Sequence, residues 1–461
     1  MRPFPLPFGP LHFIGIGGIG MSGVAELLHQ LGCPVSGSDV QASGNTARLE
    51  ALGVKVRIGH DAINLGEAAA VVASTAVPEN NPERHEAHRR GLPVLHRSEA
   101  LAAIASLSWP IAVSGTHGKT TTTAMIAAVL EAGGLDPTVV NGGILEGLGS
   151  NARLGQGPWA VIEADESDRS FLNLPTTLAI VTNIEAEHME HYRDLAEIEA
   201  CFVRFANSVP PFGRIILSAD NEGARRLAAQ CRRPVLRYGF APDADMRGDT
   251  LVLEAANSRF NVSGLACIRD LKVGVPGHHN AENALAAVSV GHLLGISEDA
   301  IRRALAEFRG VQRRFTLAGE VDGVRIIDDY AHHPTEIAAV LATARLAGCG
   351  RVMAVMQPHR YTRLSALLDE FAHCFSQADK VLIAPVYAAG EAPIAGASQE
   401  ALVAATRAGG HQDVKAIDGP EDLASCAGSW AAPGDTIVCL GAGSITTWAH
   451  ALPASLRGVW K

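Results

Sequence analysis

Lysine is scarce in this sequence. Only six lysines occur in 461 residues, at positions 55, 119, 272, 380, 415 and 461. Lysine and arginine together number 38 against 48 acidic residues, which gives a net charge of −10 with histidine neutral. Proteins bind nucleic acids and anionic membranes through basic surfaces, and the negative net charge argues against such a surface here. We therefore expect neither as a partner.

The sequence also lacks paired cysteine motifs and long apolar runs. Its eight cysteines are scattered and none forms a C-x-x-C pair, which is typical of a reduced, intracellular chain. No apolar run reaches the 18 residues that a membrane helix needs, and the proline-rich start does not match a signal peptide. We expect a cytoplasmic protein, and its length suggests about three domains.

The sequence is rich in glycine turns, and the clearest of them follows residue 110. Residues 111–113 form an apolar run that predicts a buried strand, and a helical pattern begins after Gly118-Lys119-Thr120. A strand, a glycine loop and a helix make a phosphate cradle, where Lys119 adds charge and the Thr120 hydroxyl can ligate Mg²⁺. Val113 stands where the usual spacing has a glycine. We nevertheless predict an ATP site, formed by Gly115, Thr116, His117, Gly118, Lys119, Thr120 and Thr121.

A second glycine turn lies in the first segment, residues 11–109. A predicted strand over residues 11–16 leads into a G-x-G-x-x-G string and a helix. The second strand ends at Asp39, near the position of the ribose-binding acid in dinucleotide folds, and the third ends at Ser74. The literal interpretation is an NAD domain, but a UDP-sugar also carries a diphosphate, and the segment leaves both open. The candidate ligand residues are Gly15, Gly17, Gly18, Gly20, Ser22, Asp39 and Ser74.

Acidic residues follow a buried strand in the middle segment. The strand starts at Trp159 and ends in Glu163, Asp165, Glu166 and Asp168. A neighbouring strand, residues 178–182, leads into Asn183 and His188. Strand ends meet at one edge of an α/β sheet, so Glu163, Asn183 and His188 should face the phosphate cradle. Thr120 and Glu163 offer oxygen ligands for Mg²⁺, and His188 could ligate a second metal ion or a water. The alternative for the acids is a solvated loop, above all for Asp165, Glu166 and Asp168.

A later helix begins near Pro276 and carries two asparagines. Asn280 lies near its cap and Asn283 one turn later on the same face. Capping is the simple role for Asn280, whereas two amides on one face could bind an adenine edge. The sequence leaves both roles open.

The last segment, from residue 316, predicts a third α/β unit. Its strands are expected at residues 325–327, 351–356, 380–383 and 436–440. Arg360 and Arg363 follow one strand end, while Tyr330 and His332 follow another. Two arginines beside a tyrosine and a histidine suit a small carboxylate ligand, and the alternative is a pair of solvated surface arginines.

These motifs together resemble the Mur ligases, which are ATP-dependent amide ligases that build the peptide stem of bacterial peptidoglycan. The motifs are G-T-H-G-K-T-T, E-A-D-E-S-D, N-I-E-A-E-H, G-H-H-N-A-E-N, V-Q-R-R-F and D-D-Y-A-H-H-P-T-E, in this order over nearly the whole chain. The resemblance implies three α/β domains. A Rossmann-like UDP-sugar domain spans residues 1–109, a P-loop ATPase-like domain 110–315, and a Rossmann-like amino-acid-binding domain 316–461.

The resemblance also implies roles for individual residues. Lys119, Glu163, His188 and Arg314 would be catalytic, and Thr120, Glu163 and His188 would serve the metal. The nucleotide would be contacted by His279, Asn280, Asn283, Arg314 and Asp329 in addition to the P-loop. The amino acid would be bound by Tyr330, His332, Arg360 and Arg363.

Further motifs narrow the expected reaction. G-I-G-G-I-G-M-S-G, D-D-Y-A-H-H-P-T-E, H-R-Y-T-R and Y-A-A-G-E resemble the members that join L-alanine to the lactyl carboxyl of UDP-N-acetylmuramate, using ATP and Mg²⁺, in cell-wall synthesis. The first two of these motifs also fit a sibling enzyme, and H-R-Y-T-R favours the alanine members. A sibling that joins a recycled tripeptide to the same sugar nucleotide remains the alternative. Two alternatives belong to other classes of protein. An NAD-dependent oxidoreductase would leave the Lys119-Thr120 motif unexplained, and a P-loop switch ATPase would leave the glycine turn of the first segment unexplained. Small-molecule substrates are the expected partners, for a monomer or homodimer.

One family feature is missing from the sequence. Several Mur ligases carry a carbamylated lysine in the central domain, but no lysine lies between Lys119 and Lys272 here. Glu199 stands where such a lysine would be sought. It is either an oxygen ligand or a solvated helix residue, and in both cases the enzyme should need no carbamate.

Overall fold

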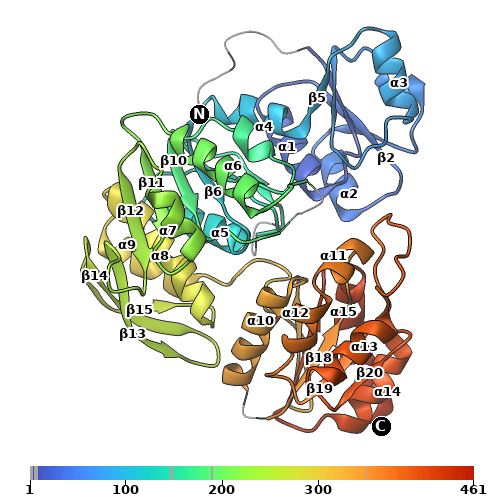
Figure 1. The fold of residues 1–461 in the computed structure, drawn as a ribbon. Coiled ribbons are helices and arrows are strands. Elements are labelled where there is room, and N and C mark those ends of the chain that lie inside the picture. Colours follow the sequence, from blue (N-terminus) through green and yellow to red (C-terminus); the bar gives the residue numbers. More distant parts are fainter. Residues whose placement is uncertain (1–3, 5–8, 146–148, 188–190, 349, 461) are drawn as a thin grey trace. The chain divides into compact units, whose positions relative to one another are not determined.

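A computed structural model describes residues 4, 9–145, 149–187, 191–348 and 350–460. It contains three sheets, and its residues divide into two compact units (Figure 1). Unit 1 comprises Met1–Asp249, Asn261–Leu271 and Glu282–Phe308, and unit 2 comprises Thr250–Phe260, Lys272–Ala281 and Arg309–Lys461. The three sheets with flanking helices confirm the predicted α/β class.

The first sheet is parallel and has the order β3-β2-β1-β4-β5. Its strands are β1 (Leu11–Ile14), β2 (Val35–Asp39), β3 (Lys55–Ile58), β4 (Ala70–Ala73) and β5 (Val94–His96). Its helices are α1 (Ile19–Gln30), α2 (Gly44–Ala51), η1 (Ala62–Leu65), α3 (Pro82–Arg89) and α4 (Arg97–Ala105). Successive residues of a strand face opposite sides. Phe13 therefore packs in one cluster with α1 and α4, while Ile14 packs in another with α3 and η1.

The second sheet forms the centre of unit 1, where the strands follow the order β13-β12-β11-β10-β6-β9-β7-β8. They are β6 (Trp109–Ser114), β7 (Thr138–Val140), β8 (Ala152–Arg153), β9 (Trp159–Glu163), β10 (Leu178–Val181), β11 (Arg214–Ser218), β12 (Val235–Gly239) and β13 (Met246–Leu253). The helices are α5 (Lys119–Ala132), η2 (Ser170–Asn173), α6 (Leu195–Asn207), α7 (Glu222–Ala228) and α9 (Glu298–Glu307). β14 (Ser258–Gly264) and β15 (Ile268–Val273) continue this sheet beyond β13, in the order β15-β14-β13. These three strands and α8 (His278–Leu293) have residues in both units.

The register of the central strands brings the predicted site residues to one edge. β6 is parallel to both β9 and β10, and Val113 is opposite Glu163 while Ser114 is opposite Val181. The glycine loop, the acids and the segment after β10 therefore leave the sheet side by side.

The first and second sheets share one apolar core. Leu27 and Ile104 of the first belong to the same buried cluster as Ile162 and Phe171 of the second. Hydrogen bonds also join them, since the Asn151 amide donates to the Ile19 carbonyl at 2.7 Å. The first and second sheets therefore belong to one compact unit.

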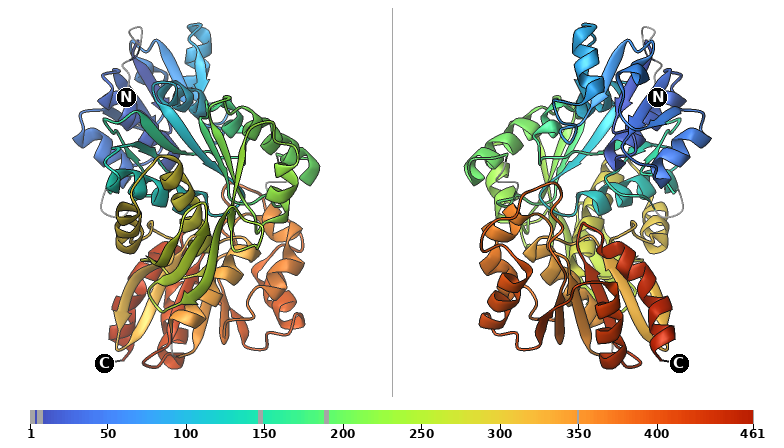
Figure 2. Two further views of the ribbon diagram at one scale, coloured as in Figure 1. Left: turned by 90° about the vertical axis from the view of Figure 1, so that its left-hand side faces the viewer. Right: turned by 90° about the vertical axis from the view of Figure 1, so that its right-hand side faces the viewer.

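The third sheet lies in unit 2 and has the order β16-β17-β21-β18-β19-β20. Its strands are β16 (Thr316–Val321), β17 (Val324–Asp329), β18 (Val352–Met356), β19 (Lys380–Ile383), β20 (Val414–Ala416) and β21 (Thr436–Leu440). Its helices are α10 (Pro334–Ala347), α11 (Tyr361–Ala366), α12 (Leu368–His373), α13 (Gln399–Ala408), α14 (Pro420–Trp430) and α15 (Ile445–Val459). Ala354 packs with α10, α12 and α13, whereas Val355 packs with α14 and α15, so helices cover both faces (Figure 2).

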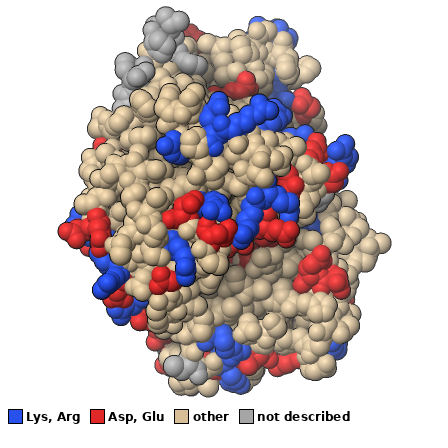
Figure 3. All heavy atoms as spheres, turned by 60° about the vertical axis from the view of Figure 1, so that its left-hand side comes forward, with Lys and Arg blue, Asp and Glu red and all other residues tan. Residues whose placement is uncertain are grey.

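Two properties of the described residues bear on the partners. None of their helices is long and apolar enough to cross a membrane. On the face drawn in Figure 3, basic and acidic side chains are interspersed.

Candidate active site

The loop between β6 and α5 has the backbone that a phosphate cradle needs. Gly115 and Gly118 have φ values of +136° and +81°, which favour glycine. A Cβ at Gly115 would collide with the Thr182 hydroxyl, and one at Gly118 would lie 2.8 Å from Asn283 Oδ1. Val113 is instead a buried residue of β6, and its carbonyl accepts from Ala164 N at 2.8 Å. The departure from the usual glycine spacing therefore falls within the strand.

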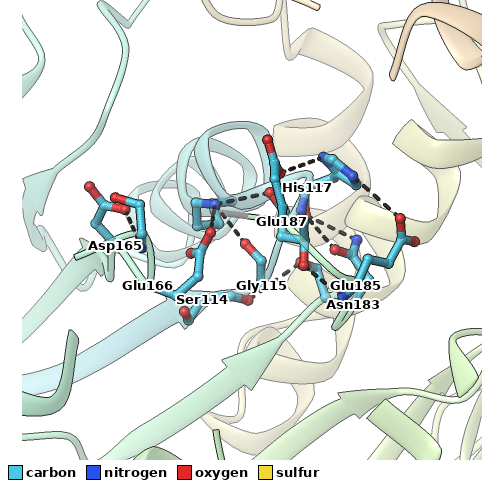
Figure 4. Close-up of polar contacts among 12 residues, drawn as sticks. Ser114, Gly115, His117, Asp165, Glu166, Asn183, Glu185 and Glu187 are labelled. Carbon is cyan, nitrogen blue, oxygen red and sulfur yellow. Dashed lines mark hydrogen bonds and ion pairs between the residues drawn. The ribbon is translucent and has the colours of Figure 1, made fainter. Parts of the chain in front are cut away.

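The segment after β10 holds this loop in place. Asn183 Oδ1 accepts from His117 N at 2.7 Å, and the Thr182 hydroxyl donates to the His117 carbonyl at 2.6 Å. Glu185 N donates to the Thr116 hydroxyl at 2.9 Å. The His117 ring lies between Glu185 and Glu187 (Figure 4), with Nε2 3.5 Å from Glu185 and Nδ1 4.0 Å from Glu187. Asn183 thus faces the loop, as the strand-end argument predicts.

Lys119 starts α5 and makes three hydrogen bonds. Its ammonium donates to the carbonyls of Gly115 at 2.6 Å and Thr116 at 3.1 Å, and to Glu166 Oε1 at 2.9 Å. Burial alone would lower the pKa of Lys119, but the charges of Glu166, Asp165 and Glu163 outweigh it and raise the pKa. The lysine is therefore a fixed cation at the loop.

The acids after β9 differ from the solvated loop that was the alternative for them. Glu166 is only 2% exposed and pairs with Lys119. The Tyr192 hydroxyl donates to the Glu166 carbonyl. Asp165 lies 3.6 Å from Arg97, and Asp168 lies 3.7 Å from His96. The solvated-loop alternative does not hold for Glu166, because its buried carboxylate has the Lys119 ammonium as partner.

Glu163 and Thr120 lie together, as their predicted metal role requires. The Thr120 hydroxyl hydrogen-bonds Glu163, and Gly142 N donates to Glu163 Oε2 at 2.7 Å. Burial raises the pKa of Glu163 despite the nearby Lys119 charge. A Cβ at Gly142 would collide with this carboxylate. Adjacent carboxylate and hydroxyl oxygens fit Mg²⁺.

The rest of the predicted metal set cannot be placed. His188 lies outside the described residues. Among the residues that are described, no group of three or more His, Cys, Asp or Glu side chains is arranged to hold a metal ion.

The two asparagines of α8 have different contacts. Asn283 Oδ1 accepts from the Thr122 hydroxyl at 2.9 Å, which places the amide against the P-loop helix. The Asn280 amide donates to the Pro276 carbonyl at 2.6 Å, at the start of its own helix. His279 directly precedes Asn280 in the chain. Burial, together with His278 and Arg314, lowers the pKa of His279 to about 4, so its ring is neutral.

The glycine turn of the first sheet is organised by two charged side chains. Gly15 has φ +76°. Asp39 Oδ2 accepts from Gly17 N at 2.8 Å, and a Cβ at Gly20 would collide with the Arg97 guanidinium. Arg97 was not among the predicted site residues.

The other predicted ligand residues of this turn lie at the start of α1 and at the end of β4. Gly18 precedes α1 as its N-cap, and the Ser22 hydroxyl donates to the Ile19 carbonyl at 3.2 Å. Ser74 directly follows β4.

In unit 2, Asp329 is held at the end of β17. Its two oxygens accept from Phe315 N and Ala331 N, each at 2.7 Å. Burial raises the pKa of Asp329 to about 6, although the Arg314 charge opposes this. Arg314 lies 3.9 Å from Glu336 and over the Tyr330 ring. The structure thus brings Arg314, Asp329 and Tyr330 together.

The predicted amino-acid-binding residues gather around His359. The His332 ring lies 5.3 Å from the Tyr330 ring and 5.9 Å from the His359 ring, and Arg363 Nη1 is 3.4 Å from His359 Nδ1. Burial, followed by the charges of His332, Arg363, Arg360 and Arg313, lowers the pKa of His359 to about 3. Because His359 is neutral, the positive charge of this site comes from the arginines, which can bind an anionic ligand.

Sequence reasoning missed His359 and Arg313 as members of this group. His359 belongs to the H-R-Y-T-R string and stacks on Tyr387 at 5.5 Å. Arg313 lies over the Tyr330 ring at 4.7 Å. Their position inside two recognised motifs was the available signal.

Models of known protein families match the parts of the chain that form each of the three sheets. Three family models match in order: "Mur ligase family, catalytic domain" over residues 10–109, "Mur ligase middle domain" over 113–291, and "Mur ligase, glutamate ligase domain" over 313–443. Curated relatives at about half identity match over nearly the whole chain. The chain belongs to the Mur ligase family.

Two of these relatives bear the same name. A UDP-N-acetylmuramate–L-alanine ligase of Agrobacterium fabrum is 51% identical over 99% of this chain and 98% of its own length. One of Rhodospirillum centenum is 50% identical over 99% of this chain and 96% of its own length.

Among solved structures, the UDP-N-acetylmuramate-alanine ligase of Thermotoga maritima is 28% identical. It covers 98% of this chain and 100% of its own, with a TM-score of 0.83. A murein peptide ligase of Psychrobacter arcticus is 25% identical, with a TM-score of 0.73 and coverage of 97% and 99%.

Proposed function

We propose that this protein joins L-alanine to the lactyl carboxyl of UDP-N-acetylmuramate, with ATP converted to ADP and phosphate. The observation that supports this most is the largely buried Lys119 cation at a glycine loop, beside the Glu163–Thr120 pair. An oxidoreductase has no use for that arrangement. The relatives' names supply the substrates, and the cytoplasm is the compartment where such precursors are made.

In the first step, the lactyl carboxylate attacks the γ-phosphorus of ATP and forms an acyl phosphate, with ADP leaving. Charge develops on the transferring phosphoryl oxygens. Lys119 neutralises part of it, and the N–H groups of the Gly115–Thr121 loop orient the phosphates. Asn283 binds the nucleotide in this proposal, and its contact with this helix through Thr122 supports the assignment.

In the second step, the neutral amine of L-alanine attacks the acyl carbon and phosphate leaves. Arg360 and Arg363 bind the amino-acid carboxylate through charge-assisted hydrogen bonds. Tyr330 and His332 line the same site, and Arg314 and Asp329 serve the nucleotide. His188 is assigned to the reacting centre.

Thr120 and Glu163 would hold Mg²⁺, which when bound stabilises negative charge on phosphate oxygens. The corresponding domain assignment is residues 1–109 for the sugar nucleotide, 110–315 for ATP and 316–461 for the amino acid. The protein is a monomer or a homodimer with small-molecule substrates.

A three-component assay tests this function. Phosphate release from ATP should require both UDP-N-acetylmuramate and L-alanine, and the product should gain the mass of one alanyl residue. Release with neither co-substrate would instead indicate an independent ATPase. Replacement of L-alanine by the recycled tripeptide tests the sibling reaction, and faster release with the tripeptide would overturn the assignment.

The acyl phosphate can be trapped separately. With ATP and UDP-N-acetylmuramate but no amino acid, hydroxylamine should yield a hydroxamate on the lactyl carboxyl. If no hydroxamate forms and label from the carboxyl oxygen never reaches phosphate, the two-step scheme is wrong.

A further inference from the structure

Arg97 places a guanidinium on the glycine turn of the first sheet. It is the first residue of α4, 77 positions after Gly20 in the chain. The three atoms that a Cβ at Gly20 would meet first all belong to Arg97, with Cζ at 3.2 Å and Cδ at 3.3 Å. Glycine at this position therefore admits a cation to the turn.

The turn itself has already used one of its donors. Gly17 N–H donates to Asp39 at 2.8 Å, so it does not point freely at a ligand. A diphosphate bound here needs positive charge from elsewhere, and an arginine fork matches phosphate oxygens better than any other side chain. Arg97 is the basic side chain that packs on this turn.

The loop after β9 fixes the start of α4. Arg97 Nη2 lies 3.6 Å from Asp165 Oδ2, and His96 Nε2 lies 3.7 Å from Asp168 Oδ2. The Asn173 amide donates to the Ser98 hydroxyl at 2.9 Å. Three successive residues of α4 and its cap are thus tied to the ATP-site loop of the second sheet.

Asp165 faces two cations. The positive charges of Lys119 and Arg97 both act on its carboxylate, and Arg97 Nη2 lies 3.6 Å from Asp165 Oδ2. Asp165 is therefore an anion between the P-loop lysine and the arginine of the sugar-nucleotide turn.

We propose that Arg97 binds the diphosphate of the nucleotide sugar, and that Asp165, a residue of the ATP-site loop, orients Arg97 for this contact. The inference rests on the proposed function and deepens it. Arg97 would touch the substrate, whereas Asp165 acts through Arg97 as a positioning residue. Asp165, although it belongs to the ATP-site loop, thus contributes to binding of the nucleotide sugar.

Binding of UDP-N-acetylmuramate to the full chain, measured by calorimetry without ATP, tests the role of Arg97. Arg97→Gln should raise the Kd by about 10- to 100-fold, the range for loss of a charge-assisted hydrogen bond. Arg97→Lys keeps the positive charge but lacks the planar guanidinium, so its Kd should lie between those of wild type and Arg97→Gln. Gly20→Ala should also raise the Kd, because its methyl group displaces the guanidinium.

Arg89→Gln is the matched control, because Arg89 is an exposed residue of α3 that pairs with Glu86 at 2.6 Å. It should bind as wild type does. Unchanged thermal melting shows that each variant is folded. A Kd for Arg97→Gln within twofold of wild type would overturn the proposal, and ligation by the wild type in the three-component assay would then leave the proposed function standing.

A double-mutant cycle tests the role of Asp165. Asp165→Asn should raise the Kd for the nucleotide sugar about threefold or more in the wild-type background and leave it unchanged in the Arg97→Gln background. Its effect on ATP binding, through Lys119, should persist in both backgrounds. An effect on nucleotide-sugar binding that is equally large without Arg97 would overturn the positioning role.

Discussion

At the scale of single residues, Lys119 has two tasks that must be separated experimentally. It supplies charge to the phosphates, and it neutralises the buried Glu166. Removing it alone takes the lysine cation away from a buried carboxylate, which destabilises the fold. A loss of activity in Lys119→Ala could therefore reflect a fold that has been weakened.

Lys119→Met combined with Glu166→Gln removes both charges and tests the chemical task. Product formation should fall by about 10²- to 10³-fold, because one contact to the developing charge is lost. Glu166→Gln alone, which keeps the lysine, is the control and should retain far more activity. Near-normal turnover and ATP affinity in the double variant would contradict the role of Lys119.

Arg363 is expected to select the amino acid. Arg363→Ala should raise the KM for L-alanine by about 10- to 100-fold and change the KM for ATP much less, because the substrate carboxylate loses charge-assisted bonds. Arg345, a partly exposed arginine of α10 that pairs with Asp379, provides the matched control. Equal changes for all three substrates would indicate a structural arginine instead.

The sequence could predict residues whose partners are close in the chain. Gly118, Lys119 and Thr120 form one turn, so their spacing alone indicated a phosphate cradle. Glu166 is 47 positions from Lys119, and Arg97 is farther still from Gly20. Such pairs depend on how strands are ordered in the sheet, which no local pattern contains. Arg360 shows another limit, because its φ of +69° is rare for a residue with a side chain.

At the scale of elements, α3 and η1 are joined to the first sheet by a buried carboxylate. Glu83 of α3 is fully buried. It accepts from the Ser38 hydroxyl of β2 at 2.5 Å and the Asn64 amide of η1 at 2.7 Å, and lies 3.3 Å from His12 Nε2 of β1. The strands and helices were predictable from apolar runs, but this polar connection was not, because its members are separated in the sequence by up to 71 positions.

Glu83 makes the stability of this domain sensitive to acid. Burial alone would raise the pKa of Glu83, but hydrogen bonds from His12, Ser38 and Asn64 lower it from 4.5 to about 2. The unfolded chain therefore takes up the proton first. The stabilisation, on the order of 3 kcal/mol, is present above pH 4.5 and is lost as the pH falls towards 2.

Glu83→Gln should remove this dependence. Wild type should melt at a higher temperature than the variant at pH 7, and the difference should shrink as the pH is lowered from 5 to 3. Glu79→Gln, at an exposed acid just before this helix that pairs with Arg84, is the control. A difference that stays constant over this pH range would show that the Glu83 carboxylate does not depend on these partners.

At the scale of the whole molecule, the order of the three sheets follows the order of the motifs. Each sheet carries its candidate ligands at strand ends, as α/β folds do. The core that the first two sheets share was harder to predict. The apolar faces of α1 and α4 pack in the core of the second sheet, so both sheets lie in one unit. A change of motif along the chain does not reveal such a shared core.

The lysine content of the whole chain leads to a final prediction, concerning carbon dioxide. A carbamate forms on a neutral lysine amine, yet no lysine lies between Lys119 and Lys272. Lys119 itself is a cation with a raised pKa, hydrogen-bonded to Glu166. Glu199, which stands where a lysine was sought, accepts from Arg226 at 2.8 and 2.6 Å. The structure therefore gives Glu199 an arginine partner.

Activity in bicarbonate-depleted buffer should consequently equal activity after bicarbonate is added, at matched pH and ionic strength. Glu199→Gln should lower activity little, because its partner Arg226 is 41% exposed and such pairs contribute about 0–1 kcal/mol. A loss of the order seen on removing Lys119 would instead mark Glu199 as a ligand. A clear rise in activity with bicarbonate would mean that a lysine is modified, and mass spectrometry of the intact protein would then have to find it among Lys55, Lys119, Lys272, Lys380, Lys415 and Lys461.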